Sequence, residues 1–273
     1  MGPIGVFDSG YGGLTVFKEI VARLPEYDYI YLGDNARVPY GTRSFETVYA
    51  YTRECVEKLF DMNCHLVVLA CNTASAKALR TLQQQDLPLY TDLRKVLGVI
   101  RPTTEIIGDY TRTRHIGILA TPGTVKSASY PIEIRKFSPD ITVHQQACPL
   151  WVPLVENNQQ ESEGAAYFVK QDIDRLLKQS SEIDTVVLAC THYPLLLPLI
   201  KRFMPPHIQI VAQGKLVADS LANYLIKHHD VEMLCTKSRH IQFFTTDNVT
   251  DFEAKTARFY GHPIQAQQLN VLI

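Results

Sequence analysis

The sequence predicts an α/β fold in which two pseudo-symmetric, doubly wound α/β domains face each other across a cleft. Three observations predict this fold. Short runs rich in Val, Ile and Leu alternate with longer segments of helical periodicity, as in parallel sheets covered by helices on both faces. Landmarks of the first half recur in the second half. The last part of the chain, beyond residue 208, has no counterpart in the first half.

Strands are expected at the short, continuous apolar runs, because strands buried on both faces of a parallel sheet lack polar alternation. These runs are Ile4–Phe7, Tyr29–Leu32, Leu66–Ala70, His115–Ala120, Ile141–Gln145, Thr185–Ala189, Gln209–Val211 and Gln242–Thr245. Helices are expected where apolar residues recur about every 3.6 positions. The clearest such segments are Arg43–Phe60, Gly164–Lys178 and Lys215–His228.

The internal repeat is carried by two pairs of similar segments. IGVFDSGYGG, from Ile4, corresponds to IGILATPGTV, from Ile116, and VVLACNTA, from Val67, corresponds to VVLACTHY, from Val186. The two offsets differ by only a few residues, so two related halves explain them better than shared composition does. We therefore expect a discontinuous first domain of residues 1–97 and 208–273, with a second domain of residues 98–207 inserted in it.

Composition excludes several classes of partner. A chain of 273 residues with a net charge of −1 and no long basic run lacks the footprint of a nucleic-acid-binding protein. No apolar stretch approaches the roughly 20 residues of a membrane span, and the start of the chain does not read as a signal peptide. The six cysteines show neither CxxC spacing nor metal-type clustering. We expect a cytoplasmic protein with no nucleic-acid or membrane partner and no metal.

Polar residues gather after the predicted strands, where open parallel sheets bind ligands. Asp8 and Ser9 open a glycine-rich turn whose backbone amides can bind an anion. The glycines can equally serve only the tight turn, and Asp8 can be a helix N-cap. Neither GxGxxG nor GxxxxGK[ST] occurs in the chain, so nothing favours a nucleotide.

The two copies of VVLAC end on Cys71 and Cys190, each after a buried-type strand and before an expected helix. A helix N-terminus favours the thiolate form of a cysteine. Two thiols on opposite sides of one substrate can remove a proton from carbon on one face and return one on the other. His192 and Asp8 are neighbours that can relay those protons. The alternative is that both cysteines are buried apolar side chains with only a structural role, which is how we interpret Cys148.

Several segments together resemble the glutamate racemase family, within the aspartate/glutamate racemase superfamily. In chain order they are FDSGYGGLTV, YLGDNARVPYG, VVLACNTASA, LGVIRP, ATPGTVKSASY, CPLWVPLVE, LACTHYPLL and FTTDNVTDFEAKTARFYG. They run over nearly the whole chain. The sequence departs from the family pattern at Ala189 and at Ala212–Gln213, where an acidic or hydroxyl residue is usual.

The resemblance implies two α/β domains with the active site in the cleft between them. It implies interconversion of L- and D-glutamate without pyridoxal phosphate or metal, supplying D-glutamate for peptidoglycan, and a homodimer. Cys71 would act on the D-enantiomer and Cys190 on the L-enantiomer, with Asp8, Glu156 and His192 assisting proton transfer. The implied substrate-binding residues are Asp8, Ser9, Tyr40, Gly41, Asn72, Thr73, Thr191 and His192.

Three alternatives stay open at this point. Another amino-acid racemase of the superfamily, such as an aspartate racemase, would share the same two cysteines. A thiol hydrolase would need one nucleophilic cysteine with a histidine base and an oxyanion hole. A binding protein that kept the fold and lost turnover is a third alternative, although both cysteines are present.

Overall fold

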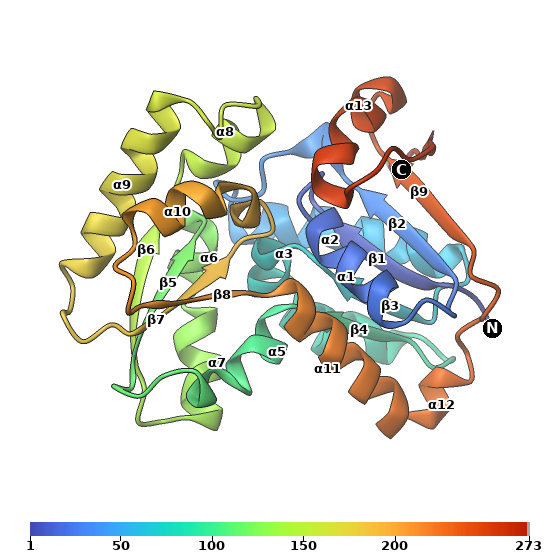
Figure 1. Ribbon diagram of the computed structural model, residues 1–273. Coiled ribbons are helices and arrows are strands. Elements are labelled where there is room, and N and C mark those ends of the chain that lie inside the picture. The colour runs from blue at the N-terminus through green and yellow to red at the C-terminus, as the bar shows by residue number, and fades with distance from the viewer. Residues whose placement is uncertain (272–273) are drawn as a thin grey trace.

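Two parallel β-sheets organise the chain in the computed structural model, which describes residues 1–271. The first sheet has the strand order β10-β9-β2-β1-β3-β4, and every neighbouring pair is parallel. Its strands are β1 (Ile4–Asp8), β2 (Tyr29–Gly33), β3 (Leu66–Leu69), β4 (Lys95–Gly98), β9 (Ile241–Thr245) and β10 (Ala266–Gln268). The right-hand part of Figure 1 contains this sheet.

The second sheet has the order β6-β5-β7-β8 and is also parallel throughout. Its strands are β5 (His115–Ala120), β6 (Thr142–Ala147), β7 (Thr185–Ala189) and β8 (Gln209–Ala212). The order β6-β5-β7-β8 repeats the order β2-β1-β3-β4 of the first sheet, so the two halves are pseudo-symmetric. Strands β9 and β10 extend the first sheet beyond β2 and have no equivalent in the second.

All eight predicted strands are present, with bounds that move by at most two residues, and β4 and β10 were not predicted. One expected boundary is wrong. We placed residue 208 and all that follows in the first domain, but β8 pairs with β7 and is the counterpart of β4. The sequence hid this because β4 is short and flanked by charged residues. The rest of the domain division stays a prediction. Residues 272–273, the last two of the predicted first domain, lie outside the described residues.

Helices pack around both sheets, and the three predicted helices are confirmed. Ser44 caps α2 by accepting from the Thr47 amide, and Ser162 caps α9 by accepting from the Ala165 amide. The helices are α1 (Leu14–Arg23), α2 (Phe45–Asp61), α3 (Asn72–Lys77), α4 (Leu79–Thr81), α5 (Ile100–Thr104), α6 (Pro122–Ser127), α7 (Ser129–Phe137), α8 (Trp151–Glu156), α9 (Glu163–Leu177), α10 (Leu197–Phe203), α11 (Gly214–Lys227), α12 (His229–Glu232) and α13 (Val249–Tyr260). Within residues 1–271, none of them is both long and apolar enough to cross a membrane.

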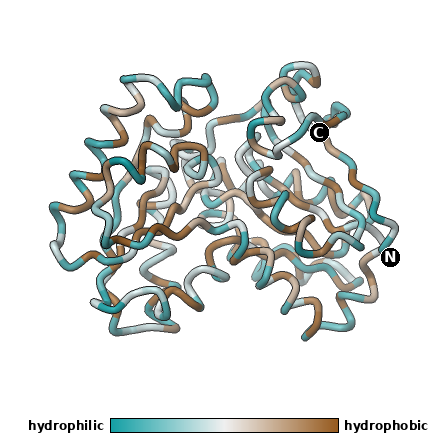
Figure 2. Tube along the Cα trace, in the orientation of Figure 1, coloured by the Kyte–Doolittle hydropathy of each residue, from teal (hydrophilic) through white to brown (hydrophobic). Residues whose placement is uncertain are grey.

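The C-terminal part of the chain returns to the first sheet and completes its core. Helix α11 packs along α1, and α13 also contacts α1. Phe17 of α1 lies at the centre of an aromatic cluster, with ring centroids 5.5 Å from Tyr31, 5.8 Å from Phe243 and 5.7 Å from Tyr260. In Figure 2 the brown, apolar segments concentrate along the interior strands, and teal predominates on the outer helices. Residues 241–260 are therefore an integral part of the first domain.

Replacing Phe17 by Ala tests the packing of the C-terminal segment against α1. Phe17 is fully buried, so its removal should cost about 3–5 kcal/mol of unfolding free energy and lower the denaturant midpoint measured by circular dichroism. Tyr167→Ala is the control, because Tyr167 is 61% exposed and should change stability by no more than about 0.5 kcal/mol. A Phe17→Ala midpoint equal to that of the control would contradict the described packing.

Candidate active site

A cavity lies between the two sheets, at the carboxyl ends of β1, β2 and β3 on one side and of β5, β6 and β7 on the other. Its volume of about 90 Å³ is several times the roughly 10–15 Å³ that one water requires. Ten of the eleven predicted site residues line it: Ser9, Tyr40, Gly41, Cys71, Asn72, Thr73, Glu156, Cys190, Thr191 and His192. The repeated strand ends therefore deliver both motif cysteines to one space.

Cys71 is the N-cap of α3, as the sequence predicted. Its sulfur accepts from the Ala74 amide at 3.4 Å and lies 3.4 Å from the Ser9 hydroxyl. The expected effect of the helix end in favour of the thiolate is outweighed by burial. Burial, reinforced by the nearby Asp8 carboxyl, raises the Cys71 pKa to about 12 and outweighs both hydrogen bonds. Cys71 is therefore a neutral thiol at neutral pH.

Cys190 has different surroundings from Cys71. We expected a helix to begin directly after Cys190, and this expectation is only partly correct. The chain makes a turn at Cys190 and then a short 3₁₀ helix, η5 (Tyr193–Leu196), whose N-cap is His192. The sulfur of Cys190 instead lies 4.0 Å from Nδ1 of His192. Nε2 of the same ring lies 3.0 Å from Oε1 of Glu156, on α8. The side chains of Cys190, His192 and Glu156 thus form a row in which His192 lies between the thiol and the carboxylate.

The charge of His192 follows from this row. Burial alone would lower the pKa of the imidazole, but hydrogen bonds to Cys190 and Glu156 outweigh it and raise the pKa to about 10. At neutral pH the ring is an imidazolium that donates to Glu156 from one nitrogen and faces Cys190 with the other. A positive charge and an exchangeable proton are therefore held beside Cys190, with no equivalent beside Cys71.

Asp8 is the one predicted site residue that does not line the cavity. It is fully buried behind Cys71, and Oδ2 accepts from the Gly10 amide at 3.0 Å. Its other oxygen, Oδ1, has no hydrogen-bond partner among residues 1–271. Burial raises the pKa of this carboxyl, and the charge of His192 only partly offsets that effect. Any influence of Asp8 on a substrate passes through Cys71 and the turn.

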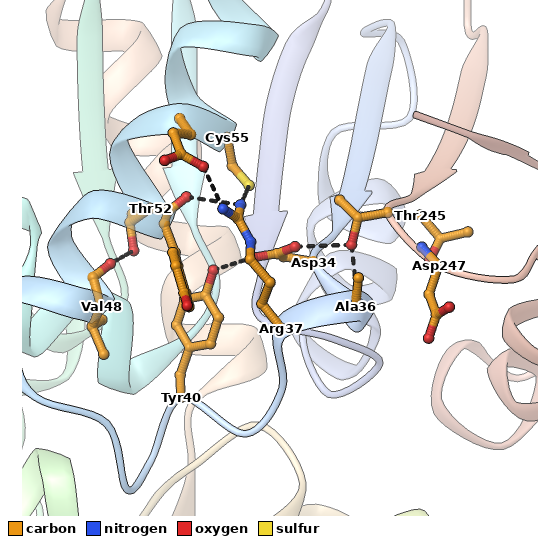
Figure 3. Close-up of polar contacts among 12 residues, drawn as sticks. Asp34, Ala36, Arg37, Tyr40, Val48, Thr52, Cys55, Thr245 and Asp247 are labelled. Carbon is orange, nitrogen blue, oxygen red and sulfur yellow. Dashed lines mark hydrogen bonds and ion pairs between the residues drawn. The ribbon is translucent and has the colours of Figure 1, made fainter. Parts of the chain in front are cut away.

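Tyr40 lines the cavity, but its hydroxyl is engaged elsewhere. It donates to Oδ2 of Asp34, which also accepts from Nε of Arg37 at 2.7 Å. Figure 3 shows these groups converging, with Cys55 behind the guanidinium of Arg37 at 3.3 Å. Burial raises the pKa of Tyr40 far above its ordinary value, so the hydroxyl stays protonated. Tyr40 therefore forms part of the cavity wall and is held in place by a buried ion pair.

Hydroxyl and amide groups make up most of the polar lining. Oγ1 of Thr73 lies 3.0 Å from Oγ1 of Thr121, which joins the two halves across the cavity. Neither Lys nor Arg lines this cavity within the described chain, so anionic groups there would meet neutral donors and the His192 imidazolium. Thr121 was not among the expected substrate-binding residues, although the repeat aligns it with Ser9. Cys148, expected to have only a structural role, also lines the cavity.

The two halves approach most closely at the glycine-rich turn. A side chain at Gly12 would lie 2.3 Å from Oγ1 of Thr191 and 2.4 Å from Nδ1 of His192. Beside it, Oγ1 of Thr15 donates to the Thr191 carbonyl at 2.8 Å. Only glycine leaves room for this contact, which indicates that the turn serves the approach of the halves rather than a bound phosphate.

No group of three or more His, Cys, Asp and Glu side chains within residues 1–271 is arranged to hold a metal ion. All six cysteines are free. The polar groups of the cavity are thus the thiols of Cys71, Cys148 and Cys190, one imidazolium–carboxylate pair and a set of neutral donors.

Comparison with known proteins gives the family. The model described as Asp/Glu/Hydantoin racemase matches residues 4–221 of the chain. The chain belongs to that family. The glutamate racemase of Bacillus cereus is 40% identical over 96% of this chain and 94% of its own length.

Solved structures of this racemase family agree over the whole chain. A glutamate racemase isoform from Bacillus anthracis has a TM-score of 0.89 at 35% identity, covering 98% of this chain and 97% of its own. The glutamate racemase of Francisella tularensis, solved in complex with D-glutamate, has a TM-score of 0.86 at 27% identity, covering 99% and 98%. The resemblance expected from the motifs and the two-domain α/β fold are both confirmed.

The protonation of His192 can be measured directly. Ring ¹³C and ¹⁵N shifts should show an imidazolium at pH 8 that titrates near pH 10. The stability contributed by this charge is complete below the ordinary pKa of about 6.5 and is lost as the pH rises through 10. Glu156→Gln should move the titration to lower pH. His144, whose pKa burial lowers, is the internal control and should be neutral at pH 8. A neutral His192 at pH 8 would contradict the described pair.

Proposed function

We propose that this chain is a glutamate racemase in which Cys71 and Cys190 act as the paired acid and base, without pyridoxal phosphate or metal. The observation that carries the proposal is that the two repeated strand ends bring both thiols to one cavity lined by neutral donors. Two different acids on the two sides of a small cavity suit proton transfer at the two faces of one carbon.

The proposed reaction conserves every proton and electron pair. With L-glutamate, the thiolate of Cys190 takes the α-proton, and the electron pair of the C–H bond stays on the α-carbon. The Cys71 thiol then donates its proton to the opposite face, giving D-glutamate, a thiol at Cys190 and a thiolate at Cys71. The reverse direction uses the same steps with the roles exchanged.

The carbanion needs stabilisation, because an amino-acid α-proton is weakly acidic. Buried, preorganised donors provide it where water is excluded. We assign this role, and the binding of the two carboxylates, to lining groups of both halves: Ser9, Gly41, Asn72, Thr73, Thr121, Thr191 and His192. Asp8 and Tyr40 are proposed to act indirectly, Asp8 through the charge it places near Cys71 and Tyr40 through the shape of the wall.

The cellular context is also a proposal. D-glutamate from this reaction would supply peptidoglycan synthesis. Six free cysteines suit a reducing compartment, which supports the cytoplasm as the location. The family resemblance implies a homodimer, which sedimentation equilibrium would test.

One observation favours a second candidate. Cys190, His192 and Glu156 form a row with the order of groups that a thiol hydrolase uses. Such an enzyme would not need Cys71, and it would release ammonia from an amide such as glutamine. An aspartate racemase would use both thiols on a shorter substrate.

Incubation with L-glutamate in deuterium oxide, without added cofactor, tests the proposal. Optical rotation should decay while deuterium enters the α-position. Cys71→Ala and Cys190→Ala should each lower the rate of racemisation at least about a hundredfold, the usual contribution of a general acid or base. The control is Cys235→Ala, which removes another buried thiol away from the cavity lining and should keep the wild-type rate.

Parallel incubations separate the alternatives. Loss of rotation with L-aspartate but not with L-glutamate would replace the proposal by an aspartate racemase. Ammonia release from glutamine that survives Cys71→Ala would favour the hydrolase. Full racemisation by either single cysteine variant would refute the two-thiol mechanism.

A further inference from the structure

Both connections between the two sheets meet at the side chain of Gln213. The first connection leaves β4 through Val99 and enters α5, which contains Thr103, and the second leaves β8 through Gln213 and enters α11. Gln213 is 4% exposed. Its Nε2 lies 3.1 Å from the Val99 carbonyl oxygen, 2.8 Å from Oγ1 of Thr103 and 2.8 Å from the Tyr130 hydroxyl. One amide group thus joins the two connections and a helix of the second domain.

The orientation of this amide follows from its partners. A backbone carbonyl can only accept, so the end of the Gln213 side chain that faces Val99 must be the NH₂ group. The opposite orientation would place two carbonyl oxygens against each other. The NH₂ group has two protons for its three contacts, the Val99 carbonyl, Thr103 Oγ1 and the Tyr130 hydroxyl, and it cannot accept a hydrogen bond from any of them.

This orientation in turn determines where the Tyr130 hydroxyl points. Tyr130, on α7, is fully buried, and its hydroxyl contacts Gln213 on one side and Oδ1 of Asn72 on the other, at 2.7 Å. Because the NH₂ group of Gln213 cannot accept a hydrogen bond, the hydroxyl proton of Tyr130 goes to Oδ1 of Asn72. Burial raises the pKa of Tyr130 well above its ordinary value, so this proton is retained over the working pH range.

The chain of donors ends in the cavity. Asn72 accepts from Tyr130 through Oδ1, so its Nδ2 group is the side that remains for the cavity, which Asn72 lines directly beside Cys71. An amide nitrogen there can donate to a substrate carboxylate, whereas the oxygen would repel it. The relay also crosses between domains, since Tyr130 belongs to the second and Asn72 to the first.

We propose that Gln213 is a positioning residue for substrate binding: through Tyr130 it orients the Asn72 amide so that a donor faces the substrate. The inference rests on the proposed role of Asn72 in binding a carboxylate. It also gives a function to the Ala212–Gln213 segment, where the sequence departs from the family pattern. A carboxylate at this position could not donate to the Val99 carbonyl and to Tyr130 at once.

The test compares Gln213→Met and Tyr130→Phe with wild type in both directions of racemisation. Each variant keeps most of the side-chain volume and removes one link of the relay. The KM for L- and D-glutamate should rise about tenfold or more, the loss expected when a hydrogen bond to a charged group is misaligned, while kcat changes by less than about threefold. The matched control is Gln83→Met, because Gln83 also donates from Nε2 to a backbone carbonyl, that of Val96, at 2.8 Å, but is not part of the relay.

An Asn72→Ala background separates a relay from general support of the fold. If Gln213 acts through Asn72, neither Gln213→Met nor Tyr130→Phe should raise KM further once Asn72 is Ala. A further rise in that background, or a KM equal to wild type for Gln213→Met alone, would overturn the inference and leave the racemase proposal intact. An unchanged KM for Asn72→Ala would overturn both the inference and the binding role of Asn72, while the deuterium experiment would still decide the two-thiol reaction.

Discussion

Burial of the side chains at the two facing sets of strand ends governs the chemistry of this protein. Burial raises the pKa of Cys71, of Asp8 behind it and of Tyr40 and Tyr130 at its borders. The Cys71 thiol and the two tyrosine hydroxyls are therefore held in their neutral forms. His192 is the exception, because its contacts with Cys190 and Glu156 outweigh the same desolvation. The site combines a neutral donor on one side with a charged pair on the other.

This asymmetry is built on a symmetric framework. The strand order β2-β1-β3-β4 recurs as β6-β5-β7-β8, so β3 and β7 deliver equivalent cysteines to one cavity. The segments that follow the cysteines differ. Helix α3 begins at once after Cys71, whereas Cys190 is followed by a turn and a 3₁₀ helix that place His192 beside it. The difference in backbone after the strand accounts for the difference in supporting groups.

Contacts between the halves connect the fold to the site. Gly12 allows the first turn to lie against Thr191 and His192, and Thr73 meets Thr121 across the cavity. At the other end, Gln213 joins both connections and leads through Tyr130 to Asn72. Because lining residues of each half take part in these contacts, the relative position of the domains and the geometry of the site depend on each other.

The sequence by itself determined the parallel sheets, the duplication and the two cysteines, because buried strands and repeated motifs are local patterns. The position of β8 and the existence of β4 were decided by strand pairing, which a short, partly charged segment does not reveal. Tertiary structure alone decided that Asp8 lies behind the cavity and that the Tyr40 hydroxyl is bound to Asp34. It also decided the protonation of Cys71 and His192, because burial and contacts with residues distant in sequence, Asp8 for Cys71 and Glu156 for His192, contribute to those pKa values.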